Sequence, residues 1–177
     1  PYSASKASSD FFVRSYSKTY EMPIIISNCS NNYGPYQHHE KLIPMVINKV
    51  LKKEPIPVYG NGENIRDWIY VQDHVNAIDM IFHNGIIGSQ YLVGGENELK
   101  NIDLIKFIIE EINMQTQSDL NSLDLINFVD DRKGHDFRYA NDITKIKEEL
   151  GWKALTSLRD GISKTVEWYL NNQSCFL

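Results

Sequence analysis

The chain has 177 residues, of which 42% are hydrophobic, and a formal net charge of −5. This length suits one domain or one large part of a two-domain enzyme. The net negative charge does not suggest a basic surface that would bind nucleic acid. No apolar run approaches the roughly 20 residues of a membrane span, so we expect neither nucleic-acid binding nor a membrane-spanning segment. The two cysteines, Cys29 and Cys175, are far apart and lack metal-ligand spacing. We therefore expect no metal site and no structural disulfide, as is typical of a reduced cytoplasmic compartment.

A helix is predicted at the start of the chain, from Tyr2 to Tyr20. Pro1 suits a helix start, and Pro23 follows the predicted end. Ile24-Ile25-Ile26 then opens a short apolar run, which is typical of a strand buried on both faces of a parallel sheet. The polar residues SNCSNNYGP are predicted to form the exit from this strand, where open α/β sheets meet their ligands.

Helix and strand patterns alternate along the rest of the chain, which predicts an α/β fold. The predicted helices run from His39 or Glu40 to Lys53 and over 73–83, 101–113, 142–150 and 158–170, with Gly151 as a C-cap of the fourth. The predicted strands are 58–59, 67–71, 90–93 and 126–128. Gly60-Asn61-Gly62 is interpreted as a turn, and residues 115–124 as a polar loop.

Tyr2 and Lys6 form a Y-x-x-x-K tetrad at the beginning of the chain. Residues four apart lie on one face of a helix, so the phenol lies beside an ammonium group. A free tyrosine has a pKa of about 10, and a nearby positive charge favours the phenolate, which can accept a proton from an alcohol during its oxidation. Ordinary surface pairs often have the same spacing, so the tetrad alone does not identify an enzyme.

The tetrad is one of several segments that resemble the nucleotide-sugar-modifying extended short-chain dehydrogenases/reductases, and most closely the dTDP-glucose 4,6-dehydratases. These segments run in the family's order over nearly the whole chain and are PYSASKASSD, SNCSNNYGPYQ, EKLIP, PVYGNGENIRDWIYVQDH, KNID, DRKGHDFRYA, ELGW and KTVEWYL. The resemblance implies the C-terminal part of a Rossmann fold with a smaller mixed α/β substrate-binding domain. Residues 1–36 would end the NAD-binding domain. Residues 37–177 would be mainly the substrate-binding domain, with some segments returning to the Rossmann domain.

The resemblance also implies an activity, the NAD-dependent dehydration of dTDP-glucose to dTDP-4-keto-6-deoxyglucose. Tyr2 would take the proton from the sugar 4-hydroxyl, Lys6 would favour the phenolate and bind the nicotinamide ribose, and Asn32 would lie near the nicotinamide. The chain has no glycine-rich dinucleotide fingerprint, and in the family that loop and an Asp-Glu acid/base pair precede the tetrad. We therefore expect a fragment that is inactive alone. The resemblance also implies that the intact enzyme is a homodimer.

The resemblance assigns a substrate site to segments far apart in the chain. Arg66 and Arg132 would bind the diphosphate, because a guanidinium matches phosphate oxygens in bidentate fashion, and His135 would add a donor. Tyr59 would stack on thymine. The other residues assigned to the substrate are Asn31, Lys41, Leu42, Pro57, Val58, Asn101, Asp131, Lys133 and Gly134.

Several of these residues also have an ordinary structural explanation. Arg66 could form a surface salt bridge with Asp67 or Glu63, a kind of pair that contributes little stability. Asn101 could cap the helix that it opens. Asn31 and Asn32 could simply be polar residues in a turn at the end of a strand.

Two other functions stay open on the sequence alone. A nucleotide-sugar epimerase or decarboxylase would share the Y-x-x-x-K tetrad and the RDWIYV segment, although DRKGHD together with KNID favours the dehydratase. A non-catalytic nucleotide-sugar-binding protein would also fit a chain without a cofactor loop.

Overall fold

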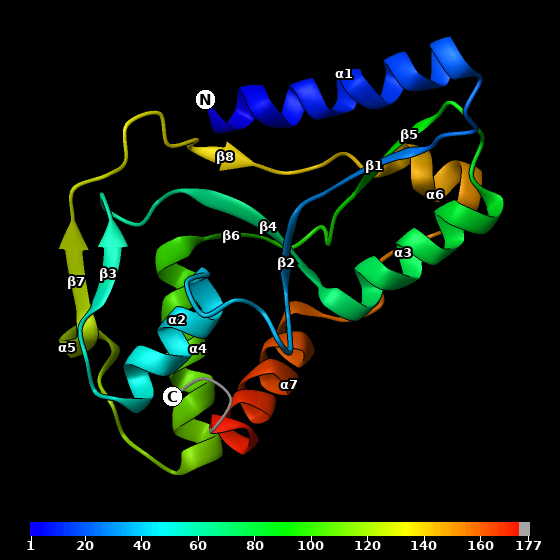
Figure 1. The fold of residues 1–177 in the computed structure, drawn as a ribbon. Helices are drawn as coiled ribbons and strands as arrows, with labels where there is room; N and C mark the ends of the chain where they lie inside the picture. Colours follow the sequence, from blue (N-terminus) through cyan, green and yellow to red (C-terminus); the bar gives the residue numbers. More distant parts are fainter. Residues whose placement is uncertain (174–177) are drawn as a thin grey trace.

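The computed structural model describes residues 1–173, apart from the side chains of residues 122 and 123, and it has the predicted alternation of helices and strands (Figure 1). Cys175 lies outside the described residues. The helices are α1 Tyr2–Tyr20, α2 Leu42–Leu51, α3 Val71–Asn84, α4 Asn101–Thr116, α5 Ser122–Leu125, α6 Thr144–Leu150 and α7 Leu158–Asn171. The strands are β1 Ile26–Cys29, β2 Asn31–Tyr33, β3 Ile56–Tyr59, β4 Ile65–Tyr70, β5 Gln90–Val93, β6 Glu98–Lys100, β7 Ile126–Val129 and β8 Arg138–Tyr139. Within residues 1–173, no helix has the length and apolar character that crossing a membrane requires.

The strands form three small sheets in which most pairs are parallel. β1 pairs with β5 and β3 pairs with β7, both in parallel. β4 is the central strand of the third sheet, where β2 and β8 pair with it in parallel and β6 pairs with it in antiparallel fashion. Because three strands pair with β4, its side chains are held on a rigid frame.

The prediction for the segment after α1 is only partly correct. β1 begins at Ile26, and its next residue, Ser27, is exposed, so the strand is not buried on both faces. The predicted polar exit is instead the end of β1 followed by β2. The ladder between β1 and β5 closes where the Ser30 amide donates to the Val93 carbonyl at 2.9 Å. Asn31 then comes into register with Trp68 of β4, and the chain changes sheet.

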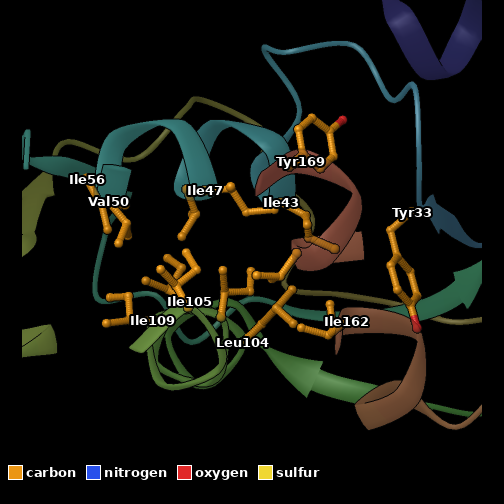
Figure 2. Close-up of a cluster of buried hydrophobic side chains, with 14 of the residues drawn as sticks. Tyr33, Ile43, Ile47, Val50, Ile56, Leu104, Ile105, Ile109, Ile162 and Tyr169 are labelled. Carbon is orange, nitrogen blue, oxygen red and sulfur yellow. The ribbon is translucent and has the colours of Figure 1, made fainter. Parts of the chain in front are cut away.

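Two hydrophobic clusters hold the elements together. The larger packs α2, α4 and α7 against β3 and β4, and Figure 2 shows Ile43 and Ile47 of α2 facing Leu104 and Ile105 of α4. The periodic isoleucines predicted for the helix over 101–113 lie here: Ile105, Ile108, Ile109 and Ile112 are buried and Ile102 is half-buried. The smaller cluster joins β5, α3 and α6 around Tyr91. Burying one such aliphatic side chain stabilises a fold by roughly 1.5–3 kcal/mol.

α1 is the exception to this packing, although its predicted bounds are confirmed. It has no buried residue, and Figure 1 shows it along the outside of the molecule. Phe12, Tyr16 and Tyr20 are four residues apart and therefore share one face. Their exposed fractions are 68%, 53% and 66%. The apolar face of α1 is thus presented to solvent.

The remaining differences concern short elements and element ends. α4 extends to Thr116 and α5 begins at Ser122, so the polar loop is shorter than the predicted 115–124. β6 and β8 have three and two residues and were not predicted. The turn at Gly60–Gly62 is confirmed by the bond from the Gly62 amide to the Tyr59 carbonyl. Gly151 is confirmed as the C-cap of α6, with a left-handed φ of 68°.

Candidate functional site

An open cleft of about 720 Å³ is lined by the start of α1, the loop over 132–136 and residues in or next to β3, β4, α2 and α4. Small-molecule sites usually have volumes of roughly 300–1,000 Å³. The lining residues are Pro1, Tyr2, Ser3, Asn31, Glu40, Lys41, Leu42, Tyr59, Arg66, Trp68, Asn101, Arg132, Lys133, Gly134, His135 and Asp136. Segments far apart in the sequence therefore build one cavity.

Most of the predicted site residues meet in this cleft. The predicted residues in its lining are Tyr2, Asn31, Lys41, Leu42, Tyr59, Arg66, Asn101, Arg132, Lys133, Gly134 and His135. Those outside the lining are Lys6, Asn32, Pro57, Val58 and Asp131. Successive strand residues point to opposite faces, which explains why Val58 is buried in the larger core while Tyr59 reaches the cleft.

The cleft carries an excess of positive charge. Its cationic side chains are Lys41, Arg66, Arg132 and Lys133, and its carboxylates are Glu40 and Asp136. Lys41 is the N-cap residue of α2. In a chain whose net charge is −5, such a local excess indicates an anionic ligand.

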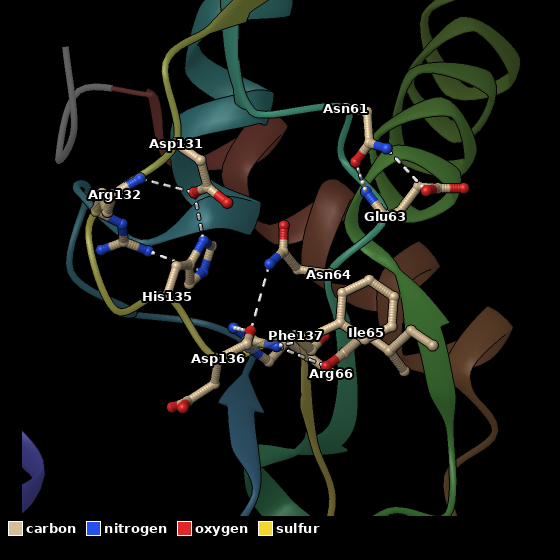
Figure 3. Close-up of polar contacts among 10 residues, drawn as sticks. All are labelled: Asn61, Glu63, Asn64, Ile65, Arg66, Asp131, Arg132, His135, Asp136 and Phe137. Atoms are coloured by element: carbon tan, nitrogen blue, oxygen red, sulfur yellow. Dashed lines mark hydrogen bonds and ion pairs between the residues drawn. The ribbon is translucent and has the colours of Figure 1, made fainter.

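Arg66 is held by backbone carbonyls and not by a carboxylate. Its guanidinium donates to the carbonyls of Ile65 and Asp136, both at 2.7 Å (Figure 3). The alternative salt bridges to Asp67 and Glu63 are absent among the described residues, since Asp67 accepts from two backbone amides and Glu63 pairs with Lys100. Burial is the largest influence on the pKa of Arg66 and lowers it below its usual range. The charge of Arg66 is therefore fixed in place and available to a ligand.

Arg132, which also lines the cleft, is held by aromatic neighbours. Its guanidinium carbon lies 4.8 Å from the centre of the Tyr59 ring, which is a cation–π distance. Its Nη2 lies 3.3 Å from Nε2 of His135 (Figure 3). The His135 ring meets Tyr59 edge to face, with centroids 6.3 Å apart. Arg132, His135 and Tyr59 thus form one packed unit at the cleft wall.

Two polar groups of the cleft residues lack partners among the described residues. Asn101 does not cap α4, because Lys100 holds the N-cap position, and the Asn101 Oδ1 is buried without a hydrogen bond. The indole Nε1 of Trp68 is also buried without one. Trp68 was not predicted as a site residue. The alternation of strand residues contained the signal, because it places Trp68 on the same face of β4 as Arg66.

Tyr2 lines the cleft from the first position of α1. Lys6 follows one helical turn later on the same face of α1 and lies outside the cleft lining. Tyr139 is a further neighbour that the sequence did not point to. Its hydroxyl donates to the Cys29 carbonyl at 3.1 Å. The pKa of Tyr139 is raised mainly by burial, with smaller contributions from Cys29 and Tyr2.

Asn32 lies in β2, outside the cleft lining. Its amide nitrogen is 3.2 Å from both the Cys29 Sγ and the Ser30 carbonyl. Its Oδ1 is buried without a partner among the described residues, and its own carbonyl accepts from Gln37 at 2.7 Å. Asn32 therefore keeps one acceptor unused.

The chain and its fold resemble those of known enzymes. A family model described as GDP-mannose 4,6 dehydratase matches residues 1–165. Relatives named probable dTDP-glucose 4,6-dehydratase from Sinorhizobium fredii and dTDP-glucose 4,6-dehydratase from Escherichia coli are 54% and 50% identical to the chain. Each match covers 97–98% of this chain and 49% of the relative. The chain thus spans about half the length of these relatives.

Solved structures agree with these matches. DesIV, a dTDP-glucose 4,6-dehydratase from Streptomyces venezuelae solved with NAD bound, has a TM-score of 0.92 and 40% identity, over 99% of this chain and 52% of DesIV. The dTDP-glucose 4,6-dehydratase of Bacillus anthracis, in complex with NAD, has a TM-score of 0.86 and 42% identity, over 98% of this chain and 53% of that one. A UDP-glucose 4-epimerase from Thermotoga maritima has 27% identity, over 98% of this chain and 54% of the epimerase. The chain therefore belongs to the GDP-mannose 4,6 dehydratase family and has the α/β fold of the extended short-chain dehydrogenases/reductases, as its motifs indicated.

Proposed function

We propose that this chain provides the nucleotide-sugar cleft of an NAD-dependent hydro-lyase that converts dTDP-glucose into dTDP-4-keto-6-deoxyglucose. The observation that carries the proposal is the presence of Arg66 and Arg132 in the lining of one cleft in an otherwise acidic chain. The relatives at about 50% identity are named for this reaction, whereas the epimerase of Thermotoga maritima is 27% identical. This difference favours the dehydratase over an epimerase.

The diphosphate of the substrate would lie between Arg66 and Arg132, with Lys41, Lys133 and His135 as further donors. A guanidinium offers two parallel N–H groups to a phosphate, and neither arginine is neutralised by a carboxylate salt bridge among the described residues. The cation excess of the cleft is consistent with a ligand that carries two or more negative charges.

The nucleoside and the sugar would occupy the remaining walls of the cleft. Tyr59 and Leu42 provide apolar surface for the base, and Pro57 and Val58 would act by holding the strand that carries Tyr59. Asn31, Asn101 and Gly134 would contact the polar groups of the substrate. The unpaired Oδ1 of Asn101 supports this role because a buried acceptor without a partner is costly and suits a ligand donor.

Tyr2 would act as the base that accepts the proton of the sugar 4-hydroxyl, and Lys6 would favour its phenolate. Two observations support binding of the nicotinamide end of NAD here. Asn32 has a buried acceptor without a partner among the described residues, and Lys6 follows Tyr2 on the same face of α1. Tyr2, Lys6 and Asn32 would hold the nicotinamide end of NAD. When bound, NAD would accept the hydride and later return it to the sugar.

The division into two domains is also proposed. Residues 1–36 would belong to the NAD-binding domain and residues 37–177 mainly to the substrate-binding domain. The smaller hydrophobic cluster joins α3, β5 and α6, and β5 pairs with β1, which supports the return of these segments to the NAD-binding domain. The homodimer and the cytoplasmic location are proposals of the same kind, supported by the exposed aromatic face of α1 for the dimer and by the cysteine spacing for the location.

A product assay tests the proposal. The complete enzyme that contains this segment is expected to convert dTDP-glucose into the 4-keto-6-deoxy product, whereas an epimerase would release dTDP-galactose. The 177-residue chain alone is expected to bind dTDP and release neither product, because the relatives are about twice its length. Release of an epimer by the complete enzyme would contradict the proposed dehydratase activity. Dehydration by the 177-residue chain alone would contradict the expectation that the rest of the enzyme is needed for activity.

A further inference from the structure

Asp131 was assigned to the substrate from the sequence, yet it stands outside the lining of the cleft. Its carboxylate faces the interior of its own loop. One oxygen, Oδ1, lies 2.6 Å from Nδ1 of His135 and accepts the backbone N–H of Arg132 at 2.7 Å (Figure 3). Both neighbours line the cleft. Asp131 therefore contacts the residues that face the ligand site.

The contact with Asp131 determines which nitrogen of the His135 ring carries a proton. An ionised carboxylate can only accept hydrogen bonds, so Nδ1 must be the donor at 2.6 Å. The hydrogen bond from His135 is the largest cause that keeps the pKa of Asp131 below its usual range, which supports an ionised carboxylate. In the neutral imidazole the other nitrogen, Nε2, is then an acceptor.

That acceptor is turned toward Arg132. The Arg132 Nη2 lies 3.3 Å from Nε2 of His135 and can donate to it in this tautomer. The His135 side chain is 10% exposed, so the ring has little freedom to turn. The opposite tautomer would place an N–H against the guanidinium. The order of donors and acceptors therefore runs from Arg132 to His135 to Asp131.

We propose that Asp131 is a positioning residue for anion binding: through His135 it fixes the Arg132 guanidinium against Tyr59 so that this cation faces the diphosphate of a nucleotide. The proposal rests on the proposed function of the cleft and assigns to Asp131 a role without ligand contact. Arginine loses considerable rotamer freedom when it is ordered. A protein that orders it before the ligand arrives gains affinity, because that cost is already met.

Asp131→Asn tests the proposal with the smallest change of shape. The amide keeps one acceptor oxygen and can also donate, which removes the preference for the Nδ1–H tautomer of His135. We expect dTDP to bind about 3- to 10-fold more weakly and thymidine to bind as before, since one hydrogen-bonded contact is lost. Asp130→Asn is the matched control, because it removes the same charge from the adjacent exposed residue and is expected to leave both affinities unchanged.

A double-mutant cycle separates positioning from simple loss of structure. If Asp131 acts through Arg132, then Asp131→Asn should weaken dTDP binding in the wild-type chain and have no further effect in an Arg132→Ala background. Equal effects in both backgrounds would overturn the proposal. Unchanged dTDP affinity in the single variant would overturn it as well. Thermal unfolding of each variant verifies that the chain is folded at the temperature of the titration.

Nitrogen NMR of the imidazole ring provides a readout that needs no nucleotide. The free chain should show His135 with the proton on Nδ1, and Asp131→Asn should move the population toward Nε2–H. The same His135 tautomer in the wild-type chain and in Asp131→Asn would contradict the proposed control of that tautomer by Asp131. If the wild-type chain shows the expected tautomer but binds no dTDP, the proposed function of the cleft is contradicted. The hydrogen bonds from Arg132 to His135 and from His135 to Asp131 would still hold.

Discussion

At the scale of single residues, the presence of Tyr2 in the cleft lining is the feature on which the proposed chemistry depends. In the complete enzyme, Tyr2→Phe removes the group proposed to accept the proton while keeping the ring. General-base contributions are typically on the order of 10²- to 10⁴-fold, so hydride transfer in a single turnover is expected to slow by that factor with dTDP affinity nearly unchanged. Tyr16→Phe is the control, since Tyr16 lies on the same helix outside the cleft lining. Hydride transfer at the wild-type rate in Tyr2→Phe would remove Tyr2 from the mechanism.

A second prediction at the residue scale concerns Asp67 and the stability of the fold. It is buried, and its two oxygens accept the amides of Gly95 and Asn97 at 3.0 and 2.8 Å. Asp67→Asn would turn an N–H group toward one of these donors. We expect it to lower the free energy of unfolding by roughly 2–3 kcal/mol, because a buried bond to a charged acceptor is replaced by two facing donors.

Urea unfolding measures this effect, with Asp119→Asn as the control at an exposed position. Exposed substitutions usually change stability by about 0.5 kcal/mol or less. A similar small change for Asp67→Asn would mean that the loop over 94–97 is held by other contacts.

At the scale of elements, the sequence predicted the long helices well and the short strands poorly. α1 has the predicted bounds and α7 ends one residue later than predicted, because caps, prolines and apolar periodicity are local signals. β5, with four residues, is an exception among the strands and also has its predicted bounds. β2, β6 and β8 have only two or three residues, which is too few to show a period, and they form because β4 offers them a partner. The loop over 131–135 was assigned as a ligand-binding segment, but its internal hydrogen bonds depend on side-chain geometry that spacing does not contain.

The exposed face of α1 leads to a prediction about association. Phe12, Tyr16 and Tyr20 form an aromatic face with no covering element among the described residues. Exposed apolar faces of this kind promote association, so the 177-residue chain is expected to self-associate as its concentration rises. Phe12→Ser should shift light scattering toward the monomer, whereas Leu155→Ser, at an exposed position outside the helices, should not. A monodisperse monomer of the wild-type chain would show that this face is stable in water.

At the scale of the whole molecule, the candidate site depends on segments from distant parts of the chain. Tyr2 comes from α1, Arg66 from β4 at the larger core, and Arg132 from the loop before β8. The sequence placed these residues in one site through a family resemblance, because nothing in their spacing shows that they meet. Trp68 was missed even though strand alternation places it on the same face of β4 as Arg66. The sequence predicts the strand that carries Trp68 and the alternation of its side chains, but it does not predict the cleft beside that strand.

The affinity of dTDP relative to thymidine tests the central claim most directly, because the two ligands differ by the diphosphate. We expect the chain to bind dTDP more tightly, and Arg66→Ala and Arg132→Ala each to weaken dTDP roughly 10- to 100-fold with little effect on thymidine, since hydrogen bonds to charged groups contribute about 1.5–3 kcal/mol. Arg159→Ala is the control, because Arg159 stacks on Phe107 outside the cleft lining. Calorimetry with equal losses for both ligands, or with no preference for dTDP in the wild-type chain, would contradict a diphosphate site between the two arginines.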